Sequence, residues 1–148
     1  MTSTPSKTPP VVTVLVVDDE PIVLQVARGL LERAGYRVLI ASTGPQALRQ
    51  LREERVSAVL LDLSMPGHHT PAILNAMRQA KPDVPIVMCT GQDIRFASDV
   101  FTGPERGPDG FLLKPFTGAE LAAAIERALS RKRDQGQGSG RRTPTPTR

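Results

Sequence analysis

The chain has 148 residues, enough for one buried core and too few for two ordinary domains. Its apolar fraction of 39% is typical of a folded soluble protein, and no apolar run approaches the roughly 20 residues that span a bilayer. The N-terminal residues lack the apolar stretch of a secretory signal, so we expect a cytoplasmic protein. The single cysteine, Cys89, excludes an internal disulfide and is expected to be a small buried residue.

The formal charge of +4 comes from the ends of the chain. Residues 131–148 hold six basic side chains and one acidic, whereas residues 11–130 hold 12 basic and 14 acidic. We therefore expect residues 1–10 and 132–148 to be disordered tails around one folded unit, residues 11–131. A nucleic-acid reader concentrates positive charge on a folded face, so we do not expect a nucleic-acid partner. For the basic tail, a solvated linker is favoured over a binding segment.

The first half of the chain alternates strand and helix patterns. Residues 12–17 are nearly all β-branched and predict a buried strand. Pro21 can open a helix that Gly35 ends, with apolar residues at helical spacing: Ile22, Val23, Val26, Leu30 and Ala34. Residues 36–41 predict a second strand. Residues 45–55 predict a helix whose inner face carries Ala47, Leu48 and Leu51.

The second half continues the alternation. Residues 56–61 predict a third strand, and Thr70 precedes a helix that begins at Pro71. Residues 85–89 and 111–113 predict two more strands, separated by an irregular segment with at most a short helix over 94–100. Thr117 and Glu120 have the spacing of a capping box before the last helix. Its apolar face is predicted to comprise Leu121, Ala124, Ile125, Ala128 and Leu129.

This alternation predicts an α/β fold with right-handed crossovers and helices on both faces of a parallel sheet. Five β/α units at this length fit a single flavodoxin-like (βα)5 doubly wound domain with strand order 2-1-3-4-5. Ligands of such sheets bind beyond the carboxyl ends of the strands, at the point where the strand order reverses.

Chemically active residues follow these strand ends. Asp18, Asp19 and Glu20 follow the first strand, and Asp62, Thr90 and Lys114 follow the third, fourth and fifth. Asp18, Asp19 and Asp62 would repel one another without a cation, and oxygen ligands without sulfur or imidazole favour Mg²⁺ or Mn²⁺. A lysine and a hydroxyl beside them suit a phosphate group. The set predicts a phosphoryl-transfer site with Asp62 as the nucleophile.

Four motifs in this order, VLVVDDEP, LLDLSMP, VMCTG and FLLKPF, resemble the response-regulator receiver family over about residues 11–131. The resemblance implies that Asp62 accepts a phosphoryl group with help from Lys114 and Thr90. It also implies a Mg²⁺ site formed by Asp18 (chiefly through water), Asp19, Asp62 and the main-chain carbonyl of Ser64. Phe111 occupies the family's rotating aromatic position, and the Lys114–Pro115 peptide bond is expected to be cis.

The chain departs from the family pattern in two places. Where the family commonly continues Met-Asp-Gly, this sequence reads His68-His69-Thr70. The two histidines have no third ligand nearby in sequence, and we interpret them as exposed polar residues. The irregular segment between the fourth and fifth strands alters the surface through which many receivers signal.

The resemblance implies a single-domain response regulator of a two-component phosphorelay that switches conformation and regulates a partner protein. Its donor would be a phosphohistidine on a sensor histidine kinase or a histidine phosphotransfer protein. It would not be a separate enzyme, but would catalyse its own phosphorylation and slow self-dephosphorylation, with Ser64 and Gln92 flanking the water path. The alternatives are a receiver module detached from a larger hybrid kinase and an interaction module without phosphorylation. A haloacid-dehalogenase-type phosphatase is disfavoured, because Ser64 stands where its second Asp would be.

Overall fold

The computed structural model describes residues 11–65, 70–91 and 107–138. Five parallel strands form one sheet in the order β2-β1-β3-β4-β5, which confirms the predicted flavodoxin-like topology. The strands are β1 (Thr13–Val17), β2 (Arg37–Ala41), β3 (Ala58–Asp62), β4 (Ile86–Thr90) and β5 (Gly110–Leu113). The helices are α1 (Pro21–Arg33), α2 (Gly44–Glu53), α3 (Thr70–Ala80) and α5 (Gly118–Gly138). None of the described helices is long and apolar enough to cross a bilayer.

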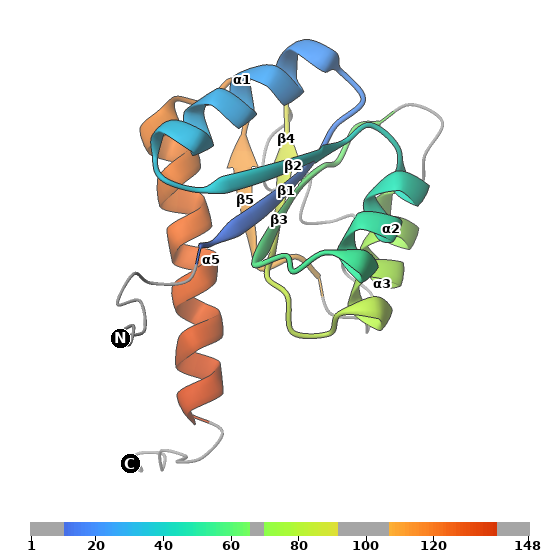
Figure 1. Ribbon diagram of the computed structural model, residues 1–148, viewed down its shortest axis with the longest axis vertical. Coiled ribbons are helices and arrows are strands. Elements are labelled where there is room, and N and C mark those ends of the chain that lie inside the picture. Colours follow the sequence, from blue (N-terminus) through green and yellow to red (C-terminus); the bar gives the residue numbers. More distant parts are fainter. Residues whose placement is uncertain (1–10, 66–69, 92–106, 139–148) are drawn as a thin grey trace, which may run out of the picture.

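Helices cover both faces of the sheet, α1 and α5 on one face and α2 and α3 on the other (Figure 1). Alternate strand residues point to opposite faces, so β1 contributes Val14 and Val16 to one core and Leu15 and Val17 to the other. The strands are therefore apolar on both sides. This is why they read in sequence as unbroken apolar runs.

The buried face of α1 is centred on residues other than those whose helical spacing indicated the helix. Leu24, Ala27 and Leu31 face the core, whereas Ile22 and Val26 are 77% and 50% exposed. The helix has apolar residues on more than one face, so spacing alone fits two different stripes. Tertiary packing buries one of them, while the other is divided between Leu30, half-buried against the core, and the exposed Ile22 and Val26.

Local signals set the helix ends largely as predicted. Gly35 follows α1 with φ of 99°, a conformation that disfavours residues with a side chain. The Thr117 hydroxyl accepts a hydrogen bond from the Glu120 amide at 3.1 Å, and the Glu120 carboxylate accepts one from the Thr117 amide at 2.8 Å. The predicted capping box therefore starts the last helix.

The last helix is longer than expected, because α5 continues to Gly138 where the sequence predicted disorder from residue 132. Arg, Lys and Gln are good helix formers, and no glycine interrupts the helix before Gly136. Among the residues up to 132, whose burial the structure describes, the last buried one is Ala128, and Figure 1 shows the last turns of the helix extending beyond the sheet. The short helix predicted over 94–100 lies outside the described residues.

We expect residues 11–131 to fold cooperatively and to accept phosphate like the full chain, because the described core residues of α5, up to Leu129, all lie within this fragment. Thermal unfolding of this fragment beside the full chain checks the expectation. A marked loss of stability in the fragment would show that the last turns of α5 belong to the folded unit.

Candidate functional site

The structure brings the predicted acids together at the carboxyl edge of the sheet. Val17 pairs with Leu61, so Asp18 and Asp62 leave adjacent strands side by side. Asp18 and Asp62 are buried, with 2% and 3% of their surface exposed, while Asp19 is half-buried. One carboxylate oxygen of each of these three acids lies within 4.8 Å of the others. The sheet geometry therefore concentrates negative charge at the predicted position.

Lys114 reaches into this cluster from the end of β5. Its Nζ lies 3.0 Å from Asp18 Oδ2 and 3.3 Å from Asp62 Oδ1, with the Glu20 carboxylate at 3.9 Å. The Lys114 amide donates to the Thr90 carbonyl at 2.7 Å, which ties the lysine to the end of β4. Thr90 itself is fully buried, and the Lys114–Pro115 bond is cis as predicted. Lys114 thus holds one positive charge among the acids.

Main-chain amides also donate hydrogen bonds to the two buried carboxylates. The Glu20 amide donates to Asp18 Oδ1 at 3.0 Å, and the Ser64 amide donates to Asp62 Oδ1 at 3.1 Å. Each acid thereby holds the backbone of the loop that follows its own strand. These hydrogen bonds offset part of the cost of burying charged groups.

The electrostatics favour a cation at this site. Burial raises the pKa of Asp62, and the charge of Asp18 raises it further, against the Ser64 hydrogen bond and Lys114, which lower it. Burial opposes the charged form of Lys114, yet its hydrogen bond to Asp18 and the charge of Asp62 leave its pKa raised. Lys114 is therefore a fixed cation, while the ionised form of Asp62 is disfavoured by its surroundings.

A divalent cation fits the donor set. The three carboxylates are hard oxygen ligands, and a single lysine does not balance their charge. Mg²⁺ commonly uses one or two protein carboxylates and keeps several waters. Asp18, Asp19 and Asp62 could hold it, while the Ser64 carbonyl, predicted from the resemblance, stays a prediction.

The structure describes some, but not all, of the other residues that the sequence analysis singled out. Phe111 is half-buried against the core, and Cys89 is buried beside the site, where desolvation raises the pKa of its thiol to about 12. His68, His69 and Gln92 lie outside the described residues. Thr70, which the sequence suggested only as a helix cap, is buried and donates its hydroxyl to the Leu63 carbonyl at 3.0 Å. Nothing in the local sequence pattern signals that contact.

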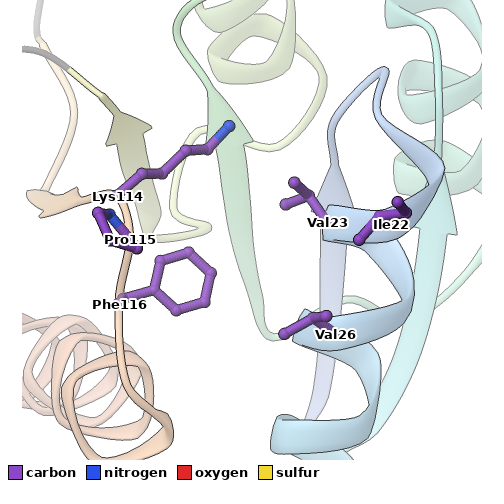
Figure 2. Close-up of a pocket in the computed structure, with 6 residues that line it drawn as sticks. All are labelled: Ile22, Val23, Val26, Lys114, Pro115 and Phe116. Atoms are coloured by element: carbon purple, nitrogen blue, oxygen red, sulfur yellow. The ribbon is translucent and has the colours of Figure 1, made fainter.

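An apolar hollow of about 360 Å³ adjoins the acidic cluster. Figure 2 shows Val23 and Val26 of α1 facing Phe116 across it, with the Lys114 side chain along one side. Ile22 and Pro115 complete its lining. The exposed stripe of α1 therefore lies next to the lysine that contacts Asp62.

Residues 14–126 match the family model described as the response regulator receiver domain. The chain belongs to this family. The matched segment contains every predicted site residue. The resemblance seen in the four sequence motifs is thereby confirmed.

Individual relatives agree with this assignment. The chain is 36% identical over 118 residues to the alkaline phosphatase synthesis transcriptional regulatory protein PhoP of Bacillus subtilis, covering 80% of this chain and 48% of PhoP. It is 37% identical over 122 residues to the DNA-binding response regulator MtrA of Mycolicibacterium smegmatis, covering 82% and 52%. The chain therefore spans about half the length of these curated relatives.

Solved structures show the same fold. A response regulator receiver domain protein from Clostridium thermocellum superposes with a TM-score of 0.74 at 31% identity, covering 84% of this chain and 99% of that one. The chemotaxis response regulator CheY4 of Vibrio cholerae superposes with a TM-score of 0.72 at 28% identity, covering 81% and 100%. This chain is thus similar in fold to nearly the whole of each of these two proteins.

We expect Mg²⁺ affinity to fall roughly tenfold or more in Asp19→Ala and by less in Asp18→Ala. Asp18 is already bound to Lys114 and to the Glu20 amide, whereas Asp19 is half-buried and closer to solvent. Calorimetric titration with MgCl₂ measures the difference, and Asp83→Ala, at an exposed position, serves as the control. Unchanged Mg²⁺ affinity in Asp19→Ala would show that these residues do not form the metal site.

Proposed function

We propose that this chain is a phosphorylation-controlled switch of a two-component system, with Asp62 as the phosphoryl acceptor. The observation that carries the proposal is the buried Asp62 carboxylate, 3.3 Å from Lys114 and clustered with two further acids. A solvated acidic loop would not bury two carboxylates and a lysine in mutual contact. Membership of the receiver family supports the same function.

In the proposed reaction, a carboxylate oxygen of Asp62 attacks the phosphorus of a phosphohistidine. The new P–O bond forms as the P–N bond breaks, and its electron pair returns to the imidazole of the donor. Because Oδ1 accepts hydrogen bonds from Ser64 and Lys114, we assign the attack to Oδ2. Bound Mg²⁺ supplies positive charge that neutralises the acids and the phosphoryl oxygens. Lys114 stabilises the product as a point charge.

The resulting acyl phosphate is the signal in this scheme. The added phosphoryl group competes with Asp62 for Lys114, and the Thr90 hydroxyl lies at the end of the adjacent strand, where it can follow that group. Phe111 is half-buried on β5 and belongs to the surface that would change with Thr90. We propose a two-state change of these residues, with reversal by self-dephosphorylation.

The apolar hollow supports a protein as the donor. A phosphohistidine that reaches Asp62 brings its own protein surface against the neighbouring surface, which includes Ile22 and Val26 of α1. Burial of these exposed side chains would contribute to the affinity of the complex. We propose that a sensor histidine kinase or histidine phosphotransfer protein occupies this hollow during transfer.

The relatives change the expectation about nucleic acid. PhoP and MtrA carry names that describe transcriptional regulation and DNA binding, and this chain matches about half of each. We therefore withdraw the expectation that nucleic acid is not a partner, and propose control of transcription as one output of the switch. A single-domain protein that acts on another protein stays a prediction.

Transfer of ³²P from phosphorylated candidate kinases, and labelling with acetyl phosphate and Mg²⁺, tests the function. We expect about one acid-labile phosphoryl group per chain, since one acceptor carboxylate is proposed. Mg²⁺ should be required, and chelation by EDTA should stop the reaction. Folded protein that accepts phosphate from neither small nor protein donors would contradict the proposal.

A further inference from the structure

Thr70 is a buried polar residue at the first position of α3, with 2% of its surface exposed. Its Oγ1 lies 3.0 Å from the Leu63 carbonyl and 3.5 Å from the Asp62 carbonyl, and it donates to them. The start of α3 is therefore bonded to the main chain that carries the acceptor.

The Leu63 carbonyl belongs to the same peptide group as the Ser64 amide, which donates a hydrogen bond to the Asp62 carboxylate. The peptide unit between Leu63 and Ser64 contains the Leu63 C=O and the Ser64 N–H, which are coplanar and point in opposite directions. Thr70 Oγ1 donates to the C=O at 3.0 Å, while the N–H donates to Asp62 Oδ1 at 3.1 Å. A hydrogen bond at one end of a planar peptide fixes the orientation of the other end and strengthens its donation.

The preceding peptide group is held by the sheet. The Leu63 amide donates to the Cys89 carbonyl of β4 at 2.8 Å, which continues the β3–β4 pairing beyond Asp62. After that point the chain leaves the sheet, and Ser64 is exposed. The Thr70 hydroxyl thus supports the backbone one residue beyond the reach of the sheet.

We propose that Thr70 is a positioning residue that sets the Leu63–Ser64 peptide plane and thereby aims the Ser64 amide at the Asp62 carboxylate. This inference rests on the proposed function for its role in phosphorylation, but its geometric part does not. The same peptide plane precedes the Ser64 carbonyl, the predicted ligand of Mg²⁺. Thr70 therefore connects α3 to both the acceptor and the metal position without contacting the phosphoryl group.

Two substitutions at this position separate the hydroxyl from the packing. Thr70→Val keeps the branched shape and removes the donor, and Thr70→Ser keeps the donor and removes a methyl group. Thr43→Val is the matched control, since Thr43 precedes α2 and its hydroxyl accepts a hydrogen bond from the Gln46 amide at 3.2 Å. It removes a threonine hydroxyl at a helix start elsewhere, so any general loss of stability is measured separately. Thermal unfolding identifies the temperature at which all variants are folded.

The direct readout is the Ser64 amide resonance in ¹H–¹⁵N NMR spectra of ¹⁵N-labelled full-length protein. We expect the Ser64 proton to move upfield in Thr70→Val, as its hydrogen bond to Asp62 weakens, and to stay close to wild type in Thr70→Ser and Thr43→Val. Titration with MgCl₂ should give roughly fivefold weaker binding for Thr70→Val and restored binding for Thr70→Ser, the effect of one hydrogen bond.

An unmoved Ser64 resonance together with wild-type Mg²⁺ affinity in folded Thr70→Val would overturn the inference. Equal loss of Mg²⁺ affinity in Thr43→Val would also overturn it, because the effect would then reflect general destabilisation. Labelling with acetyl phosphate is scored separately in wild type. If wild type takes up no phosphate, the proposed function fails, whereas the Ser64 resonance still decides the role of Thr70.

Discussion

Asp62→Asn is expected to abolish acid-labile, hydroxylamine-sensitive phosphorylation by acetyl phosphate. The asparagine amide lacks the nucleophilic oxygen anion that forms the P–O bond. Lys114 also loses its ion pair with the Asp62 carboxylate. Phosphate incorporation per chain, measured with purified protein and Mg²⁺, checks this result. Asp83→Asn, at an exposed position away from the site, should label like wild type. Labelling of Asp62→Asn at the wild-type rate would show that another residue is the acceptor.

The same substitution should change stability in a pH-dependent way. Burial, reinforced by Asp18, raises the pKa of Asp62 above its unfolded value, despite opposing contributions from Ser64 and Lys114. The stability contributed by the protonated carboxyl is fully present below the unfolded pKa, about 4, and is lost as the pH rises through the folded pKa. At neutral pH without Mg²⁺, Asp62→Asn should therefore unfold at a higher temperature than wild type. This difference should narrow as the pH approaches 4.

Ile22→Asp is expected to slow phosphoryl transfer from a phosphohistidine protein by about tenfold or more, the usual loss at a central apolar contact. Ile22 is 77% exposed and lines the hollow beside Lys114, so a charge there disturbs the donor's docking surface and not the core. Acetyl phosphate needs no docking surface and should label the variant at the wild-type rate. The ratio of the two rates isolates the effect on the donor protein.

Val11→Asp is the matched control for this prediction. Val11 is 66% exposed and does not line the hollow, so a charge at this position should leave both rates unchanged. If Ile22→Asp accepts phosphate from the phosphohistidine protein as fast as wild type, that protein docks on another surface. If it also loses labelling by acetyl phosphate, the substitution has disturbed the pocket itself.

The site could be predicted because parallel strands bring their carboxyl ends to one edge. Apolar runs predicted the five strands, and the fit to a flavodoxin-like fold predicted their order, so Asp18, Asp62 and Lys114 were expected to converge. The Thr117–Glu120 capping box was also readable, because its two hydrogen bonds join residues close in sequence. Both predictions depend on local pattern and sheet topology.

Features that depend on tertiary packing could not be read in this way. The inward face of α1 is Leu24, Ala27 and Leu31 because the sheet selects one of two apolar stripes, and the sequence shows both. The Thr70 hydroxyl donates to the carbonyl of Leu63, seven residues earlier, and no local sequence pattern predicts that contact. The length of α5 depended on a weak balance of helix propensities among the polar and glycine residues that follow Leu129 in the sequence.

Chemical mapping of the acceptor tests the central claim most directly. The wild-type protein is phosphorylated with acetyl phosphate and Mg²⁺, its acyl phosphate is reduced with borohydride, and the peptides are analysed by mass spectrometry. Reduction converts a phosphorylated aspartate to homoserine, and we predict this conversion at Asp62. Conversion at Asp18, Asp19 or any other aspartate instead, or phosphate on a hydroxyl side chain alone, would contradict the account.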